Sequence, residues 1–196
     1  MAFNNYNGNS GYNNNQNNGG EDKKKTNFAV GRLWGADGVV DVSIWNSDKG
    51  VKTIISGKSS VGKDPSTGSN VFEQKKPNEL PRFFMNVNLV RALLDATDNT
   101  DPSTLNIVMD KGQSGKLTIT GSPTEIKFII DSCKAGIGAR TITFPAINLG
   151  GKNIHSDFNI FIEYLRVCYK KGLYTKLDEN EFGMAVASED DSNLPI

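Results

Sequence analysis

Short runs of alternating apolar and polar residues, separated by turns of Gly, Asp and Asn, constrain the fold of this chain more than any other feature. The run Val39–Trp45 shows the pattern clearly, because its even-numbered residues are Val, Val and Ile. Side chains of a strand point alternately to opposite faces, so this period predicts a strand with one buried face and one face toward solvent. Phe28–Trp34 and Val51–Ser56 have similar composition and boundaries, and the three runs together predict antiparallel strands.

A helix and a second series of strands are predicted further along the chain. Asn86 or Asn88 can cap a helix that runs to about Ala96, since an Asn side chain accepts hydrogen bonds from the free N–H groups of a first turn. The two prolines at 77 and 81 exclude a helix between them. Further strands are expected at Val71–Lys76, Leu105–Asp110, Lys116–Thr120, Glu125–Ile130 and Arg140–Phe144.

The last predicted element is a long amphipathic helix. It is expected to start at Ser156 or Asp157 and to run to Lys171, with Gly172 ending it. Apolar residues recur on one side of this segment at helical spacing, which predicts a buried stripe. The stripe consists of Phe158, Phe161, Ile162, Leu165, Cys168 and Tyr169.

The segment 57–69, GKSSVGKDPSTGS, comes close to a phosphate-binding Walker A motif. Gly57, Gly62 and Lys63 have the correct spacing, but Asp64 stands where the motif needs a hydroxyl for Mg²⁺, and Pro65 begins a turn. A carboxylate at that position would repel the phosphates, which argues against an NTPase. The segment is instead predicted to be a flexible Gly/Ser/Lys loop that wraps a nucleic-acid backbone, or an ordinary hairpin loop.

Composition divides the chain into three parts. Residues 1–25 form an Asn- and Gly-rich arm without a hydrophobic period, expected to be disordered. Residues 26–176 are long enough for one domain with its own core. Residues 177–196 form an acidic tail that cannot bury enough apolar surface to order itself, so we expect this tail to be disordered as well.

The distribution of charge is uneven although the net charge is zero. All 22 Lys and Arg residues and all but six of the 22 Asp and Glu residues lie in 1–177, which gives this part a charge of +6 and the tail a charge of −6. A basic body tethered to an acidic tail can bind a polyanion, with an affinity that depends steeply on salt.

The two cysteines, Cys133 and Cys168, lack the spacing of a disulfide framework or a zinc site, and are expected to be reduced, half-buried thiols. No stretch is apolar enough to span a membrane and no signal peptide is evident, so a cytoplasmic protein is expected. For a phage-encoded protein this would be the cytoplasm of the bacterial host.

The end of the tail carries an acidic cluster, a polar spacer and a short hydrophobic tip: Glu189, Asp190, Asp191, Ser192, Asn193, Leu194, Pro195 and Ile196. This ending resembles the C-terminal tip of bacterial and phage single-stranded DNA-binding (SSB) proteins, although it ends on Ile rather than Phe. The resemblance implies that the tip docks on replication and repair partners, and that the acidic segment competes with DNA for a basic groove. The residues expected to bind partners are Glu189, Asp190, Asp191, Leu194, Pro195 and Ile196.

The predicted order of elements is about four strands, a helix, three or four strands and a second helix, which indicates an α+β domain with an antiparallel β-sheet and two helices. This β4α-β4α order resembles the Whirly and transcriptional-coactivator folds that bind single-stranded DNA. That resemblance implies a twisted sheet presented to DNA and oligomerisation through the helices, so a homo-oligomer is expected. The competing architecture is an OB-fold β-barrel, which the helix between the strands and the long last helix disfavour.

Aromatic and cationic residues interleave on the faces of the predicted strands. Arg32 shares a strand face with Trp34, and Trp45 stands near Lys52 across a turn. Such a surface suits single-stranded nucleic acid, because rings stack on bases while Lys and Arg neutralise phosphates; a core position is the alternative for each tryptophan. The expected nucleic-acid-binding residues are Arg32, Trp34, Trp45, Lys52, Lys58, Lys63, Lys116 and Lys127.

No pattern of catalytic residues is recognisable. His155 is the only histidine, and its place before the last helix, beside Ser156 and Asp157, indicates a capping role rather than general-base work. The carboxylates of Asp37, Asp41 and Asp48 fall in or beside turns without the spacing of a two-metal nuclease. We therefore predict a protein that is not an enzyme, with no metal and no cofactor.

The sequence predicts a non-catalytic, sequence-tolerant protein of a replication, recombination or repair system that binds single-stranded DNA. Phage or a mobile element is the expected source, and replication or recombination proteins are the expected partners of the tail. The alternative is a structural or assembly protein, such as a virion or scaffold component. A regulator of duplex DNA would need a helix-turn-helix, which is not recognisable here.

Overall fold

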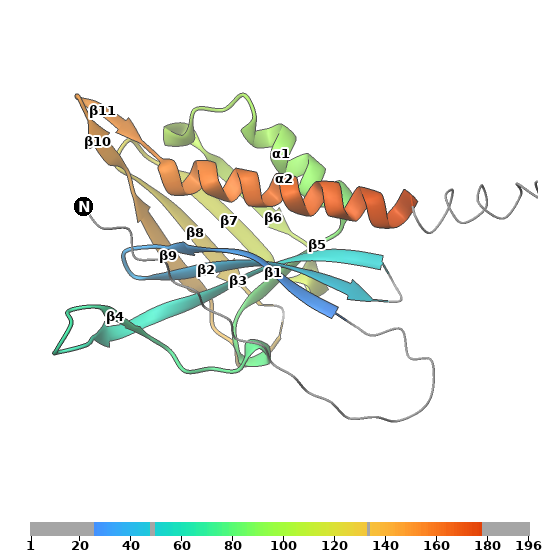
Figure 1. The fold of residues 1–196 in the computed structure, drawn as a ribbon, viewed down its shortest axis with the longest axis horizontal. Helices are drawn as coiled ribbons and strands as arrows, with labels where there is room; N and C mark the ends of the chain where they lie inside the picture. Colours follow the sequence, from blue (N-terminus) through green and yellow to red (C-terminus); the bar gives the residue numbers. More distant parts are fainter. Residues whose placement is uncertain (1–25, 48–49, 133, 178–196) are drawn as a thin grey trace, which may run out of the picture.

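Antiparallel sheets and two helices make up the described part of this chain, residues 26–47, 50–132 and 134–177 of a computed structural model (Figure 1). All strand pairs in these ranges are antiparallel. The predicted α+β class is therefore confirmed. The arm, residues 1–25, and all of the tail except Leu177 lie outside the described residues.

The first sheet is built around one long strand. Its members are β1 (Thr26–Trp34), β2 (Gly38–Ser47), β3 (Gly50–Lys63), β4 (Asn70–Phe72) and β5 (Arg82–Met85). One edge of β3 pairs with β2 from Gly50 to Ser59, while the other edge pairs with β5 in the first half of β3 and with β4 near its end. Between β4 and β5 the chain makes a single 3₁₀ turn, η1 (Pro77–Glu79).

The second sheet is a simple meander. It consists of β6 (Asn106–Asp110), β7 (Lys116–Gly121), β8 (Glu125–Asp131) and β9 (Arg140–Pro145), with 3₁₀ turns η2 (Pro102–Thr104) before β6 and η3 (Gly112–Ser114) between β6 and β7. A separate hairpin, β10 (Ile147–Leu149) and β11 (Lys152–Ile154), follows β9 and leads into the last helix. In Figure 1 this hairpin projects beyond the first turn of that helix.

Both helices cover the same side of the first sheet (Figure 1). α1 (Val87–Thr97) begins as predicted, because the Asn86 side chain accepts a hydrogen bond of 2.9 Å from the Leu89 N–H. α2 (Ser156–Leu177) buries the predicted apolar stripe, with Tyr169 half-buried. Neither helix in the described ranges combines the length and the apolar composition that a membrane span requires.

The core lies between the helices and the inner faces of both sheets. Aromatic rings join the layers: the Phe128 ring of β8 lies 4.8 Å from the Phe161 ring of α2 and 5.3 Å from the Phe144 ring of β9, centroid to centroid. From the first sheet, Val40 and Val42 enter the same cluster. The alternating pattern of β2 therefore gives the predicted core face, whereas Val39, predicted to face solvent, is buried on the opposite face.

The prediction that Gly172 ends the last helix is wrong, because α2 continues to Leu177. Gly172 is buried, and a Cβ atom on it would lie 3.2 Å from Val87 Cγ2 at the start of α1. The glycine thus lets the two helices approach closely. Packing against α1 outweighs the low helix propensity of glycine, which is only about 1 kcal/mol below that of alanine.

The loop predicted over 57–69 is also largely wrong, since β3 runs as far as Lys63. This glycine- and serine-rich stretch is held as a strand by partners on both edges: Lys58 pairs with Val39 of β2, and the Ser59 C=O accepts from the Glu73 N–H at 3.1 Å. Only residues 64–69 form a turn, closed by the Asp64 N–H on the Ser69 C=O at 2.8 Å.

Three further differences concern short strands. The strand predicted over Val71–Lys76 is limited to β4, and β5 and the β10–β11 hairpin were not predicted at all. Runs of three or four residues are too short for a period of two to stand out in a sequence.

Candidate functional site

The face of the first sheet that points away from α1 and α2, hereafter the outer face, carries most of the predicted binding residues. Cross-strand pairing arranges its side chains in four rows across the sheet. In order, the rows are Trp34–Val39–Lys58, Arg32–Asp41–Ser56–Arg82, Ala29–Ser43–Ile54–Phe84 and Trp45–Lys52. Aromatic rings therefore lie toward both ends of the outer face, and small or polar side chains dominate its middle.

One aromatic cluster, formed by Trp34 of β1 and Phe72 of β4, lies at the end of the outer face near the β3–β4 turn. The two ring centroids are 5.4 Å apart, and the Arg32 guanidinium lies 5.4 Å from the Trp34 ring centroid. Trp34 remains 60% exposed, so it is no core residue. A ring that is held by neighbours and yet open to solvent is suited to stacking on a flat ligand.

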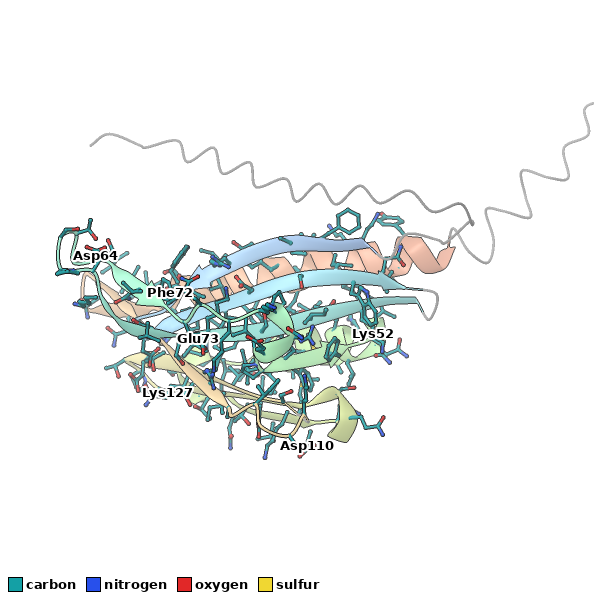
Figure 2. All side chains as sticks on the ribbon, turned by 90° about the horizontal axis from the view of Figure 1, so that it is seen from below. Lys52, Asp64, Phe72, Glu73, Asp110 and Lys127 are labelled. Atoms are coloured by element: carbon teal, nitrogen blue, oxygen red, sulfur yellow. The ribbon has the colours of Figure 1, made fainter. Side chains whose placement is uncertain are left out.

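A second aromatic cluster, Trp45 of β2 and Phe84 of β5, lies toward the opposite end. The ring centroids are 6.5 Å apart, the Lys52 ammonium lies 5.8 Å from the Trp45 ring, and the Arg82 guanidinium lies 5.4 Å from the Phe84 ring. The predicted proximity of Trp45 and Lys52 is confirmed. Figure 2 looks onto this side of the molecule, with Phe72 and Lys52 toward opposite ends.

Between the two clusters the outer face is hollowed into a cavity of about 640 Å³. Its floor is formed by β1, β2 and β3, and Pro77 and Leu80 of the segment that connects β4 to β5 form a wall. Figure 1 shows this segment passing on the side of the sheet opposite α2. The floor includes an ion pair in which Arg32 donates to both carboxylate oxygens of Asp41, at 2.5 and 2.9 Å. Hydrogen bonding to Asp41 raises the pKa of Arg32 above its usual value.

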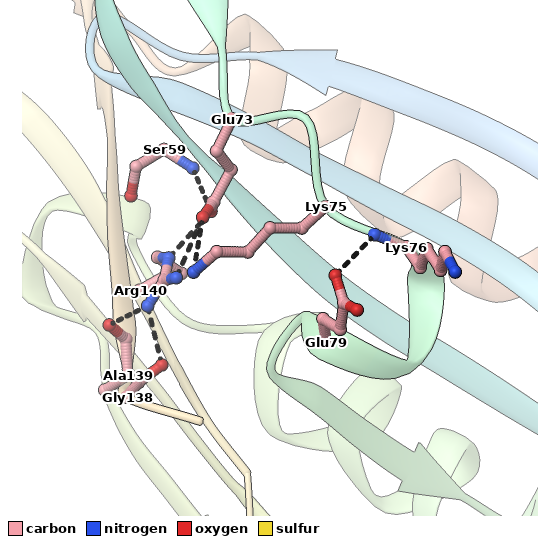
Figure 3. A network of polar contacts seen from close by, with 8 residues as sticks. All are labelled: Ser59, Glu73, Lys75, Lys76, Glu79, Gly138, Ala139 and Arg140. Atoms are coloured by element: carbon pink, nitrogen blue, oxygen red, sulfur yellow. Dashed lines mark hydrogen bonds and ion pairs between the residues drawn. The ribbon is translucent and has the colours of Figure 1, made fainter. Parts of the chain in front are cut away.

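A buried ionic network anchors the wall of this cavity (Figure 3). The Glu73 carboxylate, 8% exposed, accepts hydrogen bonds from Arg140 of β9 at 2.7 and 2.9 Å and from the Ser59 N–H at 3.0 Å. Lys75 lies 3.1 Å from the same carboxylate. The hydrogen bonds from Arg140 are the main reason why the pKa of Glu73 falls to about 2. The network ties the end of β4 to the second sheet and so fixes where the chain crosses the outer face.

The structure separates the eight predicted binding residues into groups. Arg32, Trp34, Trp45, Lys52 and Lys58 share the outer face, whereas Lys63 is exposed at the far end of β3. Lys116 and Lys127 belong to the other sheet, on the face that points away from the core, and Figure 2 shows Lys127 beyond the first sheet. Lys127 pairs there with Glu125 at 2.6 Å. The eight residues therefore do not share one surface, because alternation within a strand predicts the face on which a side chain lies but not the sheet to which the strand belongs.

Sequence reasoning missed three residues of the outer face: Phe72, Arg82 and Phe84. The sequence carries little signal for the last two, because Phe83, Phe84 and Met85 are all apolar and only their burial in the structure alternates. The predicted partner-binding residues of the tail, Glu189, Asp190, Asp191, Leu194, Pro195 and Ile196, lie outside the described residues.

His155 and Cys168, whose side chains could take part in a reaction, are buried away from the outer face. His155 precedes α2, and its C=O accepts from the Asn159 N–H at 3.1 Å, while its Nδ1 atom has no hydrogen-bond partner among the described residues. Cys168 is fully rather than half buried, and burial raises the pKa of its thiol to about 11. Cys133 lies outside the described residues. Within 26–47, 50–132 and 134–177, no three His, Cys, Asp or Glu side chains lie close enough together to hold a metal ion.

Comparison with known protein families, with curated proteins and with solved structures gives no match for this chain. Its function is therefore inferred from the chemistry of the outer face. Two ring clusters and the hollow between them distinguish this face from the outer face of the second sheet, which carries charged and hydroxyl side chains such as Lys116, Thr118 and Lys127.

Proposed function

We propose that this protein binds single-stranded DNA without strong sequence preference and without catalysing a reaction. The supporting observation is the placement of two ring clusters, Trp34 with Phe72 and Trp45 with Phe84, on one sheet face beside Arg32, Lys52 and Arg82. Bases stack on such rings whatever their identity, while cations beside the rings neutralise the phosphates. In this proposal Lys52, Lys58 and Arg82 contact phosphates, and Arg32, held by Asp41, orients Trp34.

For the finer fold, we propose the Whirly-like β4α-β4α arrangement over the OB-fold barrel. In its favour, α1 separates the two main sheets along the chain and α2 follows the second. The order of the second sheet, β6-β7-β8-β9, is an open meander. Two departures from a plain repeat are β5, which returns to β3, and the β10–β11 hairpin before α2.

The acidic tail extends this proposal to regulation and partners. Six carboxylates in 178–196 would occupy the cationic outer face when DNA is absent. Displaced by DNA, the tail would offer Leu194, Pro195 and Ile196 to replication or recombination proteins in the cytoplasm of a host cell. A source in phage or a mobile element agrees with this role.

A homo-oligomer is part of the proposal as well. α2 exposes Ile160, Val167 and Tyr174, which are spaced seven residues apart and so lie on one side of the helix. Exposed apolar residues that recur along one helix side are typical of an interface between chains.

A gel shift with labelled oligo-dT at two salt concentrations tests the binding proposal. We expect retention that weakens as salt rises, because phosphate contacts release counterions. Trp45→Ala and Phe84→Ala should each weaken retention, since stacking contributes about 1–3 kcal/mol per base. Lys127→Ala, a change on the other sheet, is the matched control and should bind as the unchanged protein does.

The second candidate function is that of a structural or assembly protein, and the β10–β11 hairpin favours it. Ile147, Leu149 and Ile154 of this small hairpin are all exposed, and a two-stranded hairpin alone is only marginally stable in water. Packing against another chain would bury them. Absence of oligo-dT retention even at low salt would support this function over the first.

A further inference from the structure

The middle of the outer face is hollow because its side chains are short. Ala29, Ser43 and Ser56 lie on its floor, and the next outward-facing side chains along their strands are the longer Arg32, Trp45 and Lys58. The resulting cavity, about 640 Å³, falls within the range of roughly 300–1,000 Å³ that is typical of small-molecule pockets. Pro77 and Leu80 close one side of it.

We propose that this hollow is a base pocket, in which one nucleobase of a bound single strand is turned out of the stack and inserted. This inference rests on the proposed function, since it locates a second mode of contact within the same surface. The ring clusters hold bases by stacking on the outside of the sheet, whereas the hollow would enclose one.

The lining of the hollow matches the chemistry of a base. Pro77, Leu80 and Ile54 are apolar and can pack against the flat faces of the ring system. Ser43 and Ser56 bring hydroxyl groups to the floor, and a hydroxyl can both donate and accept a hydrogen bond. Such groups pair with the edge of any of the four bases, which is consistent with a pocket that does not select sequence.

Cations border the same hollow. Lys58 and Arg82 both line it, from β3 and from β5. In this arrangement the base lies between the β-strands of the floor and the wall of Pro77 and Leu80. The phosphates on either side of the base contact Lys58 and Arg82. The carboxylate of Asp41 is held by Arg32 on the floor, so its charge is balanced.

The spacing of the rows of side chains places the hollow on the path that a bound single-stranded DNA would follow between the two ring clusters. Val39, beside Trp34, and Trp45 are six residues apart on β2, which corresponds to about 20 Å at roughly 3.3 Å per residue. At the stacked spacing of about 3.4 Å per nucleotide this distance holds about seven nucleotides, and fewer if the strand is extended. A single-stranded DNA that contacts both ring clusters must therefore cross the two middle rows of side chains.

The test uses the full-length protein and a set of seven-nucleotide dT oligomers, each with one abasic position, measured by fluorescence anisotropy. We expect abasic substitution to lower the affinity about fivefold or more both at stacked positions and at the pocket position. Ser43→Leu fills the hollow, so the penalty at one interior position should vanish while the penalties at stacked positions remain. Thr118→Leu, the same kind of change on β7 of the other sheet, should leave every penalty unchanged.

Two outcomes would overturn the inference in different ways. If the protein binds dT and Ser43→Leu leaves all seven penalties as they were, the hollow holds no base, although the proposed function stands. If the unchanged protein binds no oligomer at low salt, both proposals fail. Ser56→Leu fills the same hollow from β3, and circular dichroism of both variants establishes that they are folded.

Discussion

Replacement of Glu73 by Gln tests the network that positions the wall of the outer face. The glutamate carboxylate is 8% exposed, and its main partner, the Arg140 side chain, is 15% exposed. Its pKa falls from 4.5 to about 2 in the folded protein. At ~1.4 kcal/mol per pKa unit, the ionised carboxylate stabilises the fold by about 3 kcal/mol at neutral pH. Glu73→Gln removes this charge and leaves Arg140 without its counterion, so we expect a loss of about 2–4 kcal/mol at pH 7.

The sign of the pH dependence follows from the lowered pKa of Glu73. A carboxyl group whose folded pKa is depressed stabilises the protein fully above its unfolded pKa, here 4.5, and loses that contribution as the pH falls toward 2. At pH 3 about 1 kcal/mol of the contribution should remain. The difference in the free energy of unfolding between the unchanged protein and Glu73→Gln should therefore shrink by more than half between pH 7 and pH 3.

Urea unfolding followed by tryptophan fluorescence at both pH values measures this difference. Glu163→Gln is the matched control, because Glu163 pairs with Arg166 on the surface of α2 and its side chain is 65% exposed. An exposed ion pair contributes little to stability, so this variant should unfold almost as the unchanged protein does. Equal losses in the two variants, or a loss in Glu73→Gln that is the same at pH 3 as at pH 7, would refute the reasoning.

Three other changes test separate parts of the structure. Truncation after residue 187 removes the final acidic cluster and should tighten oligo-dT binding at low salt in anisotropy titrations; unchanged or weaker binding would contradict competition by the tail. Gly172→Leu forces a side chain against Val87 and should lower the free energy of unfolding by about 1–3 kcal/mol, measured by urea titration, whereas an unaltered value would mean that the helices separate at no cost. Asn86→Ala removes the cap of α1 and should cost about 1 kcal/mol in the same assay, and a change of no more than a few tenths would mean that water replaces the cap.

Local patterns in the sequence determined much of the fold. The alternation in Val39–Trp45 predicts the core-facing residues of β2, although Val39 on the opposite face is buried as well, and the apolar stripe of α2 is the one that the core contains. Asn86 marks the start of α1 because a cap satisfies N–H groups only three residues away. Each of these features depends on neighbours within one element, so a single sequence carries the information.

The sequence also gave the proximity of ring and cation within the outer face, since Arg32 and Trp34 are two residues apart on one strand and Trp45 and Lys52 are joined by one turn. It gave no information on which sheet each further lysine would join. Lys116 and Lys127 satisfied the same local pattern as Lys52, yet they belong to a different surface.

Only the tertiary structure decided the features that depend on contacts between distant segments. Gly172 continues a helix because Val87, 85 positions earlier, packs against it, and the glycine- and serine-rich stretch after Gly57 is a strand because β2 and Glu73 hold its two edges. The pairing of Trp34 with Phe72 and of Trp45 with Phe84, and the hollow between them, arise from the return of β4 and β5 to β3. Side-chain period is a property of one strand, whereas the choice of neighbouring strands is made by the packing of the whole core.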